Sequence, residues 1–297
     1  MLDFRLETFL TLCKTRNYTK TAGELHITQP AVSQHIKYLE NYYGCKLFHY
    51  SGKTLTLTTQ GEKLKSFVMT MKANSGRIKE LMGEEDNSYP ITFGATLTIG
   101  EYVMGDIIKS LLKEHPDIRL TMEVDNTKEL LEKLKDGQVD FVLLEGQFDK
   151  CKYSSMLFSM EEFIAVCSSE SPLVLREVEL EELFNERLIL REYGSGSRDI
   201  FEQVLYEYNL TIDSFKSVTE IANIKVIKEL VRENLGITFI YREAVKDELK
   251  KGILKEIKIK DFQVEREFNF VFLQESIHFQ EYKEWFNYLL KLKLKNK

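Results

Sequence analysis

Apolar residues in the first 40 positions recur at helical spacing and are interrupted by short polar turns. Leu6 and Phe9 begin this repeat, which predicts a first helix with one buried face. A second, shorter helix is expected over residues 18–25, because Asn17 is a favourable N-cap residue. A third is expected after Thr28, another favourable cap, with a proline in its first turn, where the missing N–H costs little.

The third helix has a buried and an exposed face. Val32, Ile36 and Leu39 follow the i, i+4, i+7 spacing of residues that face a core. The polar residues left on the other face are Gln29, Ser33, Gln34 and Lys37. Two helices joined by a three-residue turn, with small polar side chains exposed on the second, are the pattern of a helix-turn-helix, which reads DNA with that face.

A hairpin and a long helix are expected next. Residues 46–58 alternate polar and apolar positions around Ser51-Gly52-Lys53, which predicts a β-hairpin wing. Thr59 and Glu62 then have the spacing of a capping box at a helix start.

The long helix carries one apolar stripe that needs a cover. Its members are Leu64, Phe67, Val68, Met71, Ile78, Leu81 and Met82. A partner helix from a second subunit would cover it and predicts a homodimer, although Asn74-Ser75-Gly76 interrupts the seam. The alternative is that the stripe packs against its own domain.

From Pro90 onward, strand-like and helix-like runs alternate. Strands are expected in two sets, at 91–94, 119–124 and 139–144, and at 163–167, 187–190, 217–219 and 237–240. Helices are expected near 100–114, 128–135, 197–208 and 223–234, followed by a strand over 268–273 and a helix over 279–292. This α/β alternation predicts parallel sheets covered on both faces, and the two sets predict two lobes.

The net charge of −6 over 297 residues argues, taken alone, against a nucleic-acid partner. The charge is unevenly distributed, however. Residues 1–58 hold seven Lys and Arg against four acids, a net charge of +3, so that the rest of the chain carries −9. Opposite signs in two segments indicate two different tasks.

Composition excludes several other classes of protein. The four cysteines lie far apart without a C-x-x-C pair, so we expect buried free thiols rather than disulfides or a zinc site. The longest apolar stretches are strand-sized, and the first ten residues carry three charges where a signal peptide would be apolar. We therefore expect a soluble, cytoplasmic protein that neither spans a membrane nor carries a cofactor.

Several motifs stand close together in the first 65 residues. Phe9 precedes the run 18–40, which contains T-Q-P-A-V-S at 28–33, and G-C-K-L-F at 44–48 and L-T-T-Q-G at 57–61 follow. Together these residues resemble the N-terminal signature of LysR-type transcriptional regulators. The resemblance is looser over the rest of the chain but covers nearly all of it.

The resemblance implies a winged helix-turn-helix over 1–58, a linker and dimerisation helix over 59–88, and an effector domain over 89–297. That domain would be similar to periplasmic solute-binding proteins, with lobe I at about 89–161 and 266–297 and lobe II at about 162–265. It also implies homotetramers that bind imperfect palindromes upstream of regulated genes. Many members carry Arg where this chain has Gln34 and Tyr50. Because Arg binds phosphate or guanine through two parallel hydrogen bonds, its loss would weaken the DNA grip or change the preferred base.

The third helix and its surroundings supply the predicted DNA contacts. Base contacts are expected from Gln29, Pro30, Ser33 and Gln34, since amides suit adenine and proline can pack on a thymine methyl group. Phosphate contacts are expected from Thr19, Lys20, Thr28, Lys37 and Lys53. An isolated Gln or Ser would ordinarily be read as solvated helix surface, but this motif favours DNA.

Three segments place polar side chains where a strand leads into a helix, a position at which free N–H groups bind anions. The effector-binding residues predicted from them are Thr96, Thr98, Asn126, Thr127, Ser195, Ser197 and Arg198. Glu145, at the end of a strand, adds a carboxylate, and Lys225 adds a cation. Each segment would equally fit an ordinary helix cap, but in the family that this chain resembles the effector sits between the lobes on the corresponding loops.

The identity of the effector is narrowed by the same segments. TLTIGEY, LLEG, LREYGSGSR and EIANIK are similar to the subgroup of the family linked to sulfur assimilation. Two anion-binding helix ends and one acid would suit a small anionic or amino-acid-like metabolite, such as O-acetylserine. The sequence does not name the effector or the regulated genes, and does not separate activation from repression.

An enzyme and a stand-alone solute-binding protein are the rival classes. The chain has no G-x-x-x-x-G-K-[ST], no G-x-G-x-x-G after a strand and no H-E-x-x-H, and its five histidines are scattered. The N-terminal 60 residues and the charged first ten argue against an exported binding protein. We therefore predict a regulator without catalytic or metal-binding residues.

Overall fold

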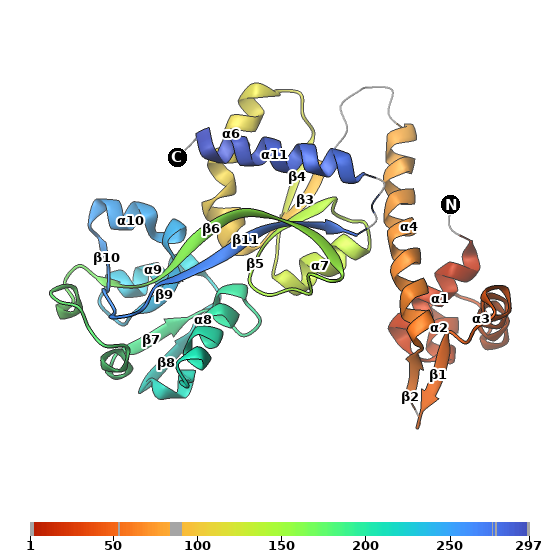
Figure 1. Cartoon of the computed structure of the whole chain (residues 1–297), viewed down its shortest axis with the longest axis horizontal. Coiled ribbons are helices and arrows are strands. Elements are labelled where there is room, and N and C mark those ends of the chain that lie inside the picture. The colour runs from red at the N-terminus through yellow and green to blue at the C-terminus, as the bar shows by residue number, and fades with distance from the viewer. Residues whose placement is uncertain (1–2, 53, 84–90, 275, 277, 296–297) are drawn as a thin grey trace. The chain divides into compact units, whose positions relative to one another are not determined.

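The computed structural model describes residues 3–52, 54–83, 91–274, 276 and 278–295 (Figure 1). The chain forms two compact units. One contains the N-terminal helices and hairpin, and the other contains most of the strands and helices from Ile91 onward.

The N-terminal unit begins with three helices, as the periodicity predicts. They are α1 (Phe4–Thr15), α2 (Tyr18–Glu24) and α3 (Gln29–Tyr43). Both predicted caps are present. The side chain of Asn17 accepts hydrogen bonds from the N–H groups of Thr19 and Lys20 at 2.9 and 3.0 Å, and Thr28 Oγ1 accepts one from Ala31 N–H at 3.3 Å. Each cap satisfies donors that a first turn leaves free, which fixes where the helix begins.

The wing follows at the predicted place. β1 (Phe48–Ser51) pairs antiparallel with β2 (Thr54–Leu57), and Ser51 lies opposite Thr54. Gly52, in the turn between them, has a φ of +63°, which glycine adopts without strain. Lys53, the predicted phosphate contact of the wing, lies outside the described residues.

The long helix α4 (Thr59–Gly83) begins at Thr59 itself, so the residue before it is the cap. Thr58 Oγ1 accepts a hydrogen bond from Gly61 N–H at 3.0 Å. The predicted capping box of Thr59 and Glu62 is therefore wrong by one residue. The helix also continues through residues 74–76, where the sequence interrupts the apolar stripe.

The apolar stripe of α4 is divided between two environments. Leu64 and Val68 are buried in the core of the N-terminal unit together with residues of α1, so the helix's own domain covers this part. Phe67 and Met71 remain 53% and 39% exposed. The side chains of residues 78, 81 and 82 lie outside the described part of the chain.

The second unit is organised by one mixed sheet, which has seven strands in the described part of the chain. The strand order is β10-β6-β11-β5-β3-β4, and β9 also pairs with β6. The strands are β3 (Ile91–Ala95), β4 (Leu120–Val124), β5 (Phe141–Glu145), β6 (Tyr153–Ser168), β9 (Thr238–Tyr241), β10 (Leu254–Glu256) and β11 (Val264–Leu273). A separate parallel pair is formed by β7 (Arg187–Leu190) and β8 (Ser217–Glu220).

The prediction of parallel sheets is only partly right. β3 is parallel to β4 and to β5, as expected for strands joined through helices. β11 is antiparallel to β5, and β9 and β10 are antiparallel to β6. The long strands β6 and β11 run between the two lobes (Figure 1). The lobes are therefore joined through continuous strands as well as through loops.

Helices cover the strands of both lobes. Lobe I carries α5 (Leu97–Tyr102), α6 (Met104–Glu114), α7 (Thr127–Lys135) and α11 (Phe279–Lys295), and lobe II carries α8 (Gly196–Glu207), α9 (Ile224–Arg232) and α10 (Lys246–Lys251). The single helix predicted over 100–114 is two helices that meet at Val103. The predicted fold class, a winged helix-turn-helix followed by a long helix and a two-lobed α/β domain, is confirmed.

The four cysteines are free. Cys13 and Cys167 are buried, as predicted, whereas Cys45 is half-buried and Cys151 is exposed, so the prediction of buried thiols is wrong for these two. Among the described residues, no helix combines the length and the apolar character needed to cross a membrane.

Candidate functional site

The exposed face of α3 carries the predicted base-contacting residues. Gln29, Pro30 and Gln34 are exposed, and Ser33 is half-buried. Gln29 Nε2 donates a hydrogen bond to Ser33 Oγ at 2.9 Å, one helical turn away. The amide of Gln29 is thereby oriented on the helix surface, where it can offer a donor and an acceptor to a base edge.

The predicted phosphate contacts surround this face. Thr19 and Lys20 are exposed in the first turn of α2, Thr28 is exposed at the start of α3, and Lys37 is exposed farther along α3. The N-termini of both helices add partial positive charge to the lysines. This region of the N-terminal unit therefore suits a polyanion.

A half-buried contact joins α3 to α1. Thr8 Oγ1 and His35 Nδ1 lie 2.9 Å apart, and the ring of Phe4 packs edge-on against the imidazole at 4.9 Å. Burial lowers the pKa of His35, so the imidazole is neutral in this packing. His35 thus helps to hold α3 against α1.

Gln34 and Tyr50, the two positions at which many members of the LysR-type family carry arginine, are both accessible to solvent. Gln34 is exposed on α3, and Tyr50 is 66% exposed on β1 of the wing. Neither side chain belongs to the hydrophobic core, so the packing of the domain does not require a particular residue at either position.

In the second unit, two predicted segments of lobe I converge on Glu145, at the end of β5. Thr98 Oγ1 donates a hydrogen bond to Glu145 Oε1 at 2.9 Å. Glu145 N–H donates to Thr96 Oγ1 at 3.4 Å, and Thr127 Oγ1 donates to the Glu145 carbonyl at 3.3 Å. These contacts explain why small hydroxyl side chains follow β3 and β4: they bond to Glu145, the last residue of β5.

Lobe II meets the same carboxylate through the N-terminus of α8. A Cβ atom on Gly196 would lie 3.0 Å from the Glu145 carbonyl oxygen and 3.2 Å from its Cγ, so glycine allows a backbone-to-backbone approach. Ser195 Oγ accepts a hydrogen bond from Arg198 N–H at 3.3 Å and caps the helix. Ser197 Oγ is buried without a hydrogen-bond partner in the described part of the chain.

Glu145 is the most perturbed acid of this cluster. Its side chain is buried with only 2% of the residue exposed, and burial raises its pKa to about 7. The hydrogen bond from Thr98 and the charge of Arg191 oppose that rise. Oε1 is occupied by Thr98, whereas Oε2 has no hydrogen-bond partner among the described residues. The carboxyl group can therefore change protonation near neutrality and has one oxygen available for a ligand.

Other predicted effector residues lie apart from Glu145 or are already engaged. Arg198 forms ion pairs with Glu202 and with Glu220 and also donates to a backbone carbonyl. Asn126 is exposed and caps α7, where it accepts a hydrogen bond from a backbone N–H at 3.0 Å. Lys225 is exposed at the start of α9. Their side chains are not aimed at the carboxyl group by any of these contacts.

Two residues near Glu145 were not predicted. Arg191, immediately after β7, is the charge that lowers the pKa of Glu145. Tyr241, at the end of β9, is fully buried, and its hydroxyl lacks a hydrogen-bond partner in the described residues. Arg191 belongs to the LREYGSGSR segment but was not among its predicted effector residues, and Tyr241 belongs to none of the quoted motifs.

A cleft of about 690 Å³ begins where β5 ends. Gly146 lines it directly after Glu145, and Gln147 Nε2 donates a hydrogen bond to Gln203 Oε1 of α8 at 2.5 Å. Ile200 of α8 and Arg266 of β11 line the cleft as well. The buried cluster around Glu145 thus borders a space between the lobes that is large enough for a small metabolite.

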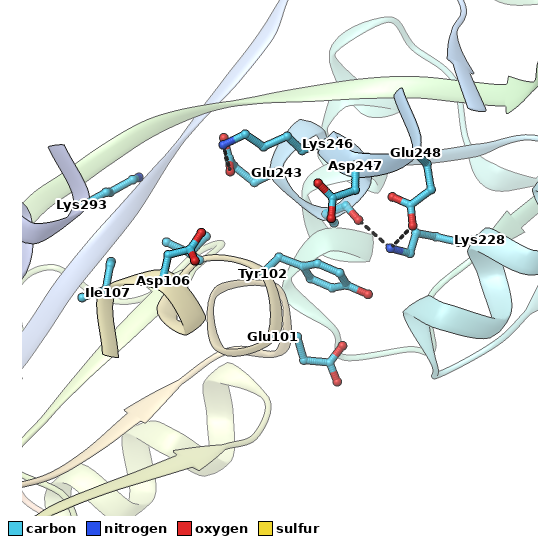
Figure 2. A pocket seen from close by; sticks show the side chains of 12 residues that line it. Glu101, Tyr102, Asp106, Ile107, Lys228, Glu243, Lys246, Asp247, Glu248 and Lys293 are labelled. Atoms are coloured by element: carbon cyan, nitrogen blue, oxygen red, sulfur yellow. Dashed lines mark hydrogen bonds and ion pairs between the residues drawn. The ribbon is translucent and has the colours of Figure 1, made fainter. Parts of the chain in front are cut away.

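A smaller pocket of about 280 Å³ lies where residues of α5 face those of α9 and α10 (Figure 2). Lys228 Nζ pairs with Glu248 Oε1 at 2.7 Å, donates to the Ala244 carbonyl at 3.0 Å, and lies 4.7 Å from the centroid of the Tyr102 ring. Acidic side chains outnumber the lysines in its lining, which includes Glu101. This pocket does not suit an anion, so the predicted anion site is not here.

In the described residues, no group of three or more His, Cys, Asp or Glu side chains is placed to hold a metal ion.

Comparison with known proteins places both units in one family. Residues 4–62 match the family described as bacterial regulatory helix-turn-helix protein, lysR family, and residues 84–292 match the LysR substrate binding domain. The uncharacterized HTH-type transcriptional regulator YeiE of Escherichia coli strain K12 is 29% identical over 255 residues, which cover 86% of this chain and 85% of that protein. The HTH-type transcriptional regulator CysL of Bacillus subtilis strain 168 is 28% identical over 269 residues, which cover 90% and 89%.

The fold is shared with solved structures over the whole chain. Full-length LysG from Corynebacterium glutamicum, solved with its effector Arg bound, has a TM-score of 0.65 at 14% identity and covers 99% of both chains. The family matches extend over most of the chain, and the relatives named above are transcriptional regulators. The chain therefore belongs to the LysR family of transcriptional regulators, with a helix-turn-helix domain and an effector-binding domain.

Proposed function

We propose that this regulator binds operator DNA as a homodimer, or as a tetramer built from two such dimers, and that a small amino-acid-like or anionic metabolite bound at Glu145 controls it. The observation that carries the effector part is the buried carboxyl group of Glu145, with one free oxygen, placed against the N-terminus of the 12-residue helix α8.

The two sides of this site favour different chemical groups on the ligand. The N-terminus of α8 and the hydroxyl of Ser197 offer hydrogen-bond donors, which favour an anionic or acceptor group. Glu145 Oε2 is an acceptor when ionised, which favours an ammonium or hydroxyl group. A compact metabolite with both features satisfies both sides. The similarity of the surrounding loops to the sulfur-assimilation subgroup makes O-acetylserine the first compound to test.

The DNA part rests on the exposed face of α3 and the basic surroundings of α2. A domain with a net charge of only +3 neutralises few phosphates, so it loses affinity quickly as salt rises. Two domains joined through α4 double the contacts and act with a high effective concentration. The exposed side chains of Phe67 and Met71 on α4 supply apolar surface for that pairing.

Gel-shift and footprinting assays on the DNA upstream of the regulator's own gene test the DNA part, with random DNA as the control. A protected, imperfectly palindromic site supports it; equal affinity for both DNAs refutes it. Calorimetry with the full chain and O-acetylserine, serine or sulfate tests the effector part. Heat that disappears in Glu145→Ala supports the site, and absence of heat with every compound refutes this effector class.

A further inference from the structure

Three polar oxygens without partners are buried where the lobes meet. Glu145 Oε2, Ser197 Oγ and the hydroxyl of Tyr241 lack hydrogen-bond partners among the described residues, and their residues are 2%, 6% and 0% exposed. A buried polar group without a partner is unfavourable by about 1–3 kcal/mol. Folded proteins therefore keep such groups where a ligand or an ordered water satisfies them.

Tyr241 is brought to Glu145 by the register of the sheet. Phe268 of β11 lies directly opposite Glu145 of β5, so the two side chains are on the same face of the sheet. The ring of Tyr241 packs edge-on against Phe268, with centroids 4.8 Å apart, and edge-on against Phe163, its own partner on β6, at 5.2 Å. The two rings hold the tyrosine in place and leave its hydroxyl as the only polar atom of the side chain.

The charges around Tyr241 agree with this placement. Burial and then the charge of Glu145 raise the pKa of Tyr241 well above its usual value, and Arg266 has the opposite effect. The hydroxyl therefore keeps its proton at every physiological pH and is available as a hydrogen-bond donor. Glu145 Oε2 can accept a hydrogen bond and the hydroxyl of Tyr241 can donate one. Together they suit a ligand that carries both a hydrogen-bond donor and an acceptor.

We propose that the hydroxyl of Tyr241 contacts the effector and, with Glu145, selects ligands that carry a hydrogen-bond donor and an acceptor on neighbouring atoms, as α-amino and α-hydroxy acids do. The proposal rests on the proposed function, because it concerns the same ligand. It adds a residue that the motifs do not predict, and it narrows the ligand from any small anion to this class.

Tyr241→Phe tests the proposal, because it removes one oxygen and leaves the aromatic packing intact. Tyr102→Phe is the matched control: the hydroxyl of Tyr102 is also buried, but it lines the smaller pocket of Figure 2, beside Glu101. Binding of O-acetylserine and serine to the full chain is measured by calorimetry, with sulfate as a ligand that lacks the donor. Thermal unfolding of each variant is measured without ligand.

We expect Tyr241→Phe to bind the amino acids about fivefold more weakly or worse, since it loses one buried hydrogen bond. Tyr102→Phe should bind them like the wild type. Tyr241→Phe should not unfold earlier than the wild type, because it loses a hydroxyl group that the protein itself does not satisfy. Sulfate should bind wild type and Tyr241→Phe more weakly than the amino acids.

Two results would overturn the proposal while leaving the proposed function intact. One is equal affinity of wild type and Tyr241→Phe, above all if the variant is less stable, since a structural water would then be the partner of the hydroxyl. The other is preference for sulfate over the amino acids. Absence of binding of any compound to the wild type would instead overturn the proposed effector class, and this proposal with it.

Discussion

Replacing Glu145 by glutamine should make the protein more stable and unable to respond to its effector. The buried carboxyl group has its pKa raised from 4.5 to about 7, so the folded state holds the proton more tightly than the unfolded chain. As pH rises through this interval the unfolded chain ionises first, and the folded state loses stability. Glutamine keeps the shape and can accept the hydrogen bond from Thr98, but it does not ionise.

The size of the effect follows from the pKa difference. One pKa unit corresponds to about 1.4 kcal/mol, so the shift amounts to about 3 kcal/mol above pH 7. The penalty is about 1 kcal/mol at pH 5, because that pH lies only about half a unit above the pKa of 4.5 that the carboxyl group has in the unfolded chain. Glu145→Gln should therefore exceed the wild type in free energy of unfolding by about 3 kcal/mol at pH 8 and by about 1 kcal/mol at pH 5.

Urea unfolding of the full chain at both pH values measures this, with effector-domain fluorescence from Trp285 as the signal. Glu161→Gln is the contrasting control. Glu161 is also buried, but it pairs with the buried ammonium group of Lys293, so removing its charge should destabilise the protein by about 3–5 kcal/mol. The reasoning would be refuted if Glu145→Gln were less stable than the wild type at pH 8. It would also be refuted if the difference in stability between the variant and the wild type were the same at pH 5 and pH 8.

Three further predictions concern the N-terminal unit. Gly61→Ala should destabilise it, because a Cβ atom would lie 2.2 Å from the carbonyl oxygen of Leu47, whereas Gly23→Ala meets open space and should stabilise α2; thermal unfolding compares them. Gln29→Ala should weaken operator binding by about 1–3 kcal/mol and leave random-DNA binding unchanged in gel shifts, and equal losses would assign Gln29 to the backbone. Phe67→Glu should shift the chain toward monomer in sedimentation and weaken operator binding with it; an unchanged oligomer would remove α4 from the interface.

Local signals in the sequence predict the N-terminal unit well. Caps such as Asn17 and Thr28, and the i, i+4 spacing of residues such as Val32, depend only on neighbours within one or two turns. The error at Thr59 arises because two adjacent threonines both fit an N-cap. The flanking structure decides between them, since Thr58 also donates a hydrogen bond to the carbonyl of Lys46 at 2.7 Å.

Strand β6 shows where local signals fail. Only residues 163–167 of its 16 are apolar enough to predict a strand. Ser159 and Glu161 interrupt the pattern, but both contact Lys293 of α11, which is 132 residues from Glu161 in sequence. When the partner of a buried charge is so distant, the sequence alone predicts that the charged residue is exposed. The antiparallel pairing of β9, β10 and β11 could not be predicted either, because it joins strands that lie far apart in the sequence.

The candidate effector site was predicted in part. The loops with Thr96, Thr98 and Thr127 converge on Glu145, because strand ends in a sheet lie at one edge. The orientation of Arg198 toward acids of its own lobe and the approach of Tyr241 depend on contacts between distant strands and helices. A motif locates such a site, but it does not tell which side chains remain available within it.

The first turns of α4 have a mechanical consequence. Leu64 and Val68 belong to the core of the N-terminal helices, so these helices and the start of α4 form one rigid unit. A DNA-binding domain truncated after residue 58 would lack two of its core side chains. The 25-residue helix is a lever about 37 Å long. A tilt of about 5° along it displaces one end by about 3 Å relative to the other, which is about the rise of one base pair. In the proposed dimer, a very small rotation between the two α4 helices would therefore be enough to move the two DNA-binding domains out of register on DNA.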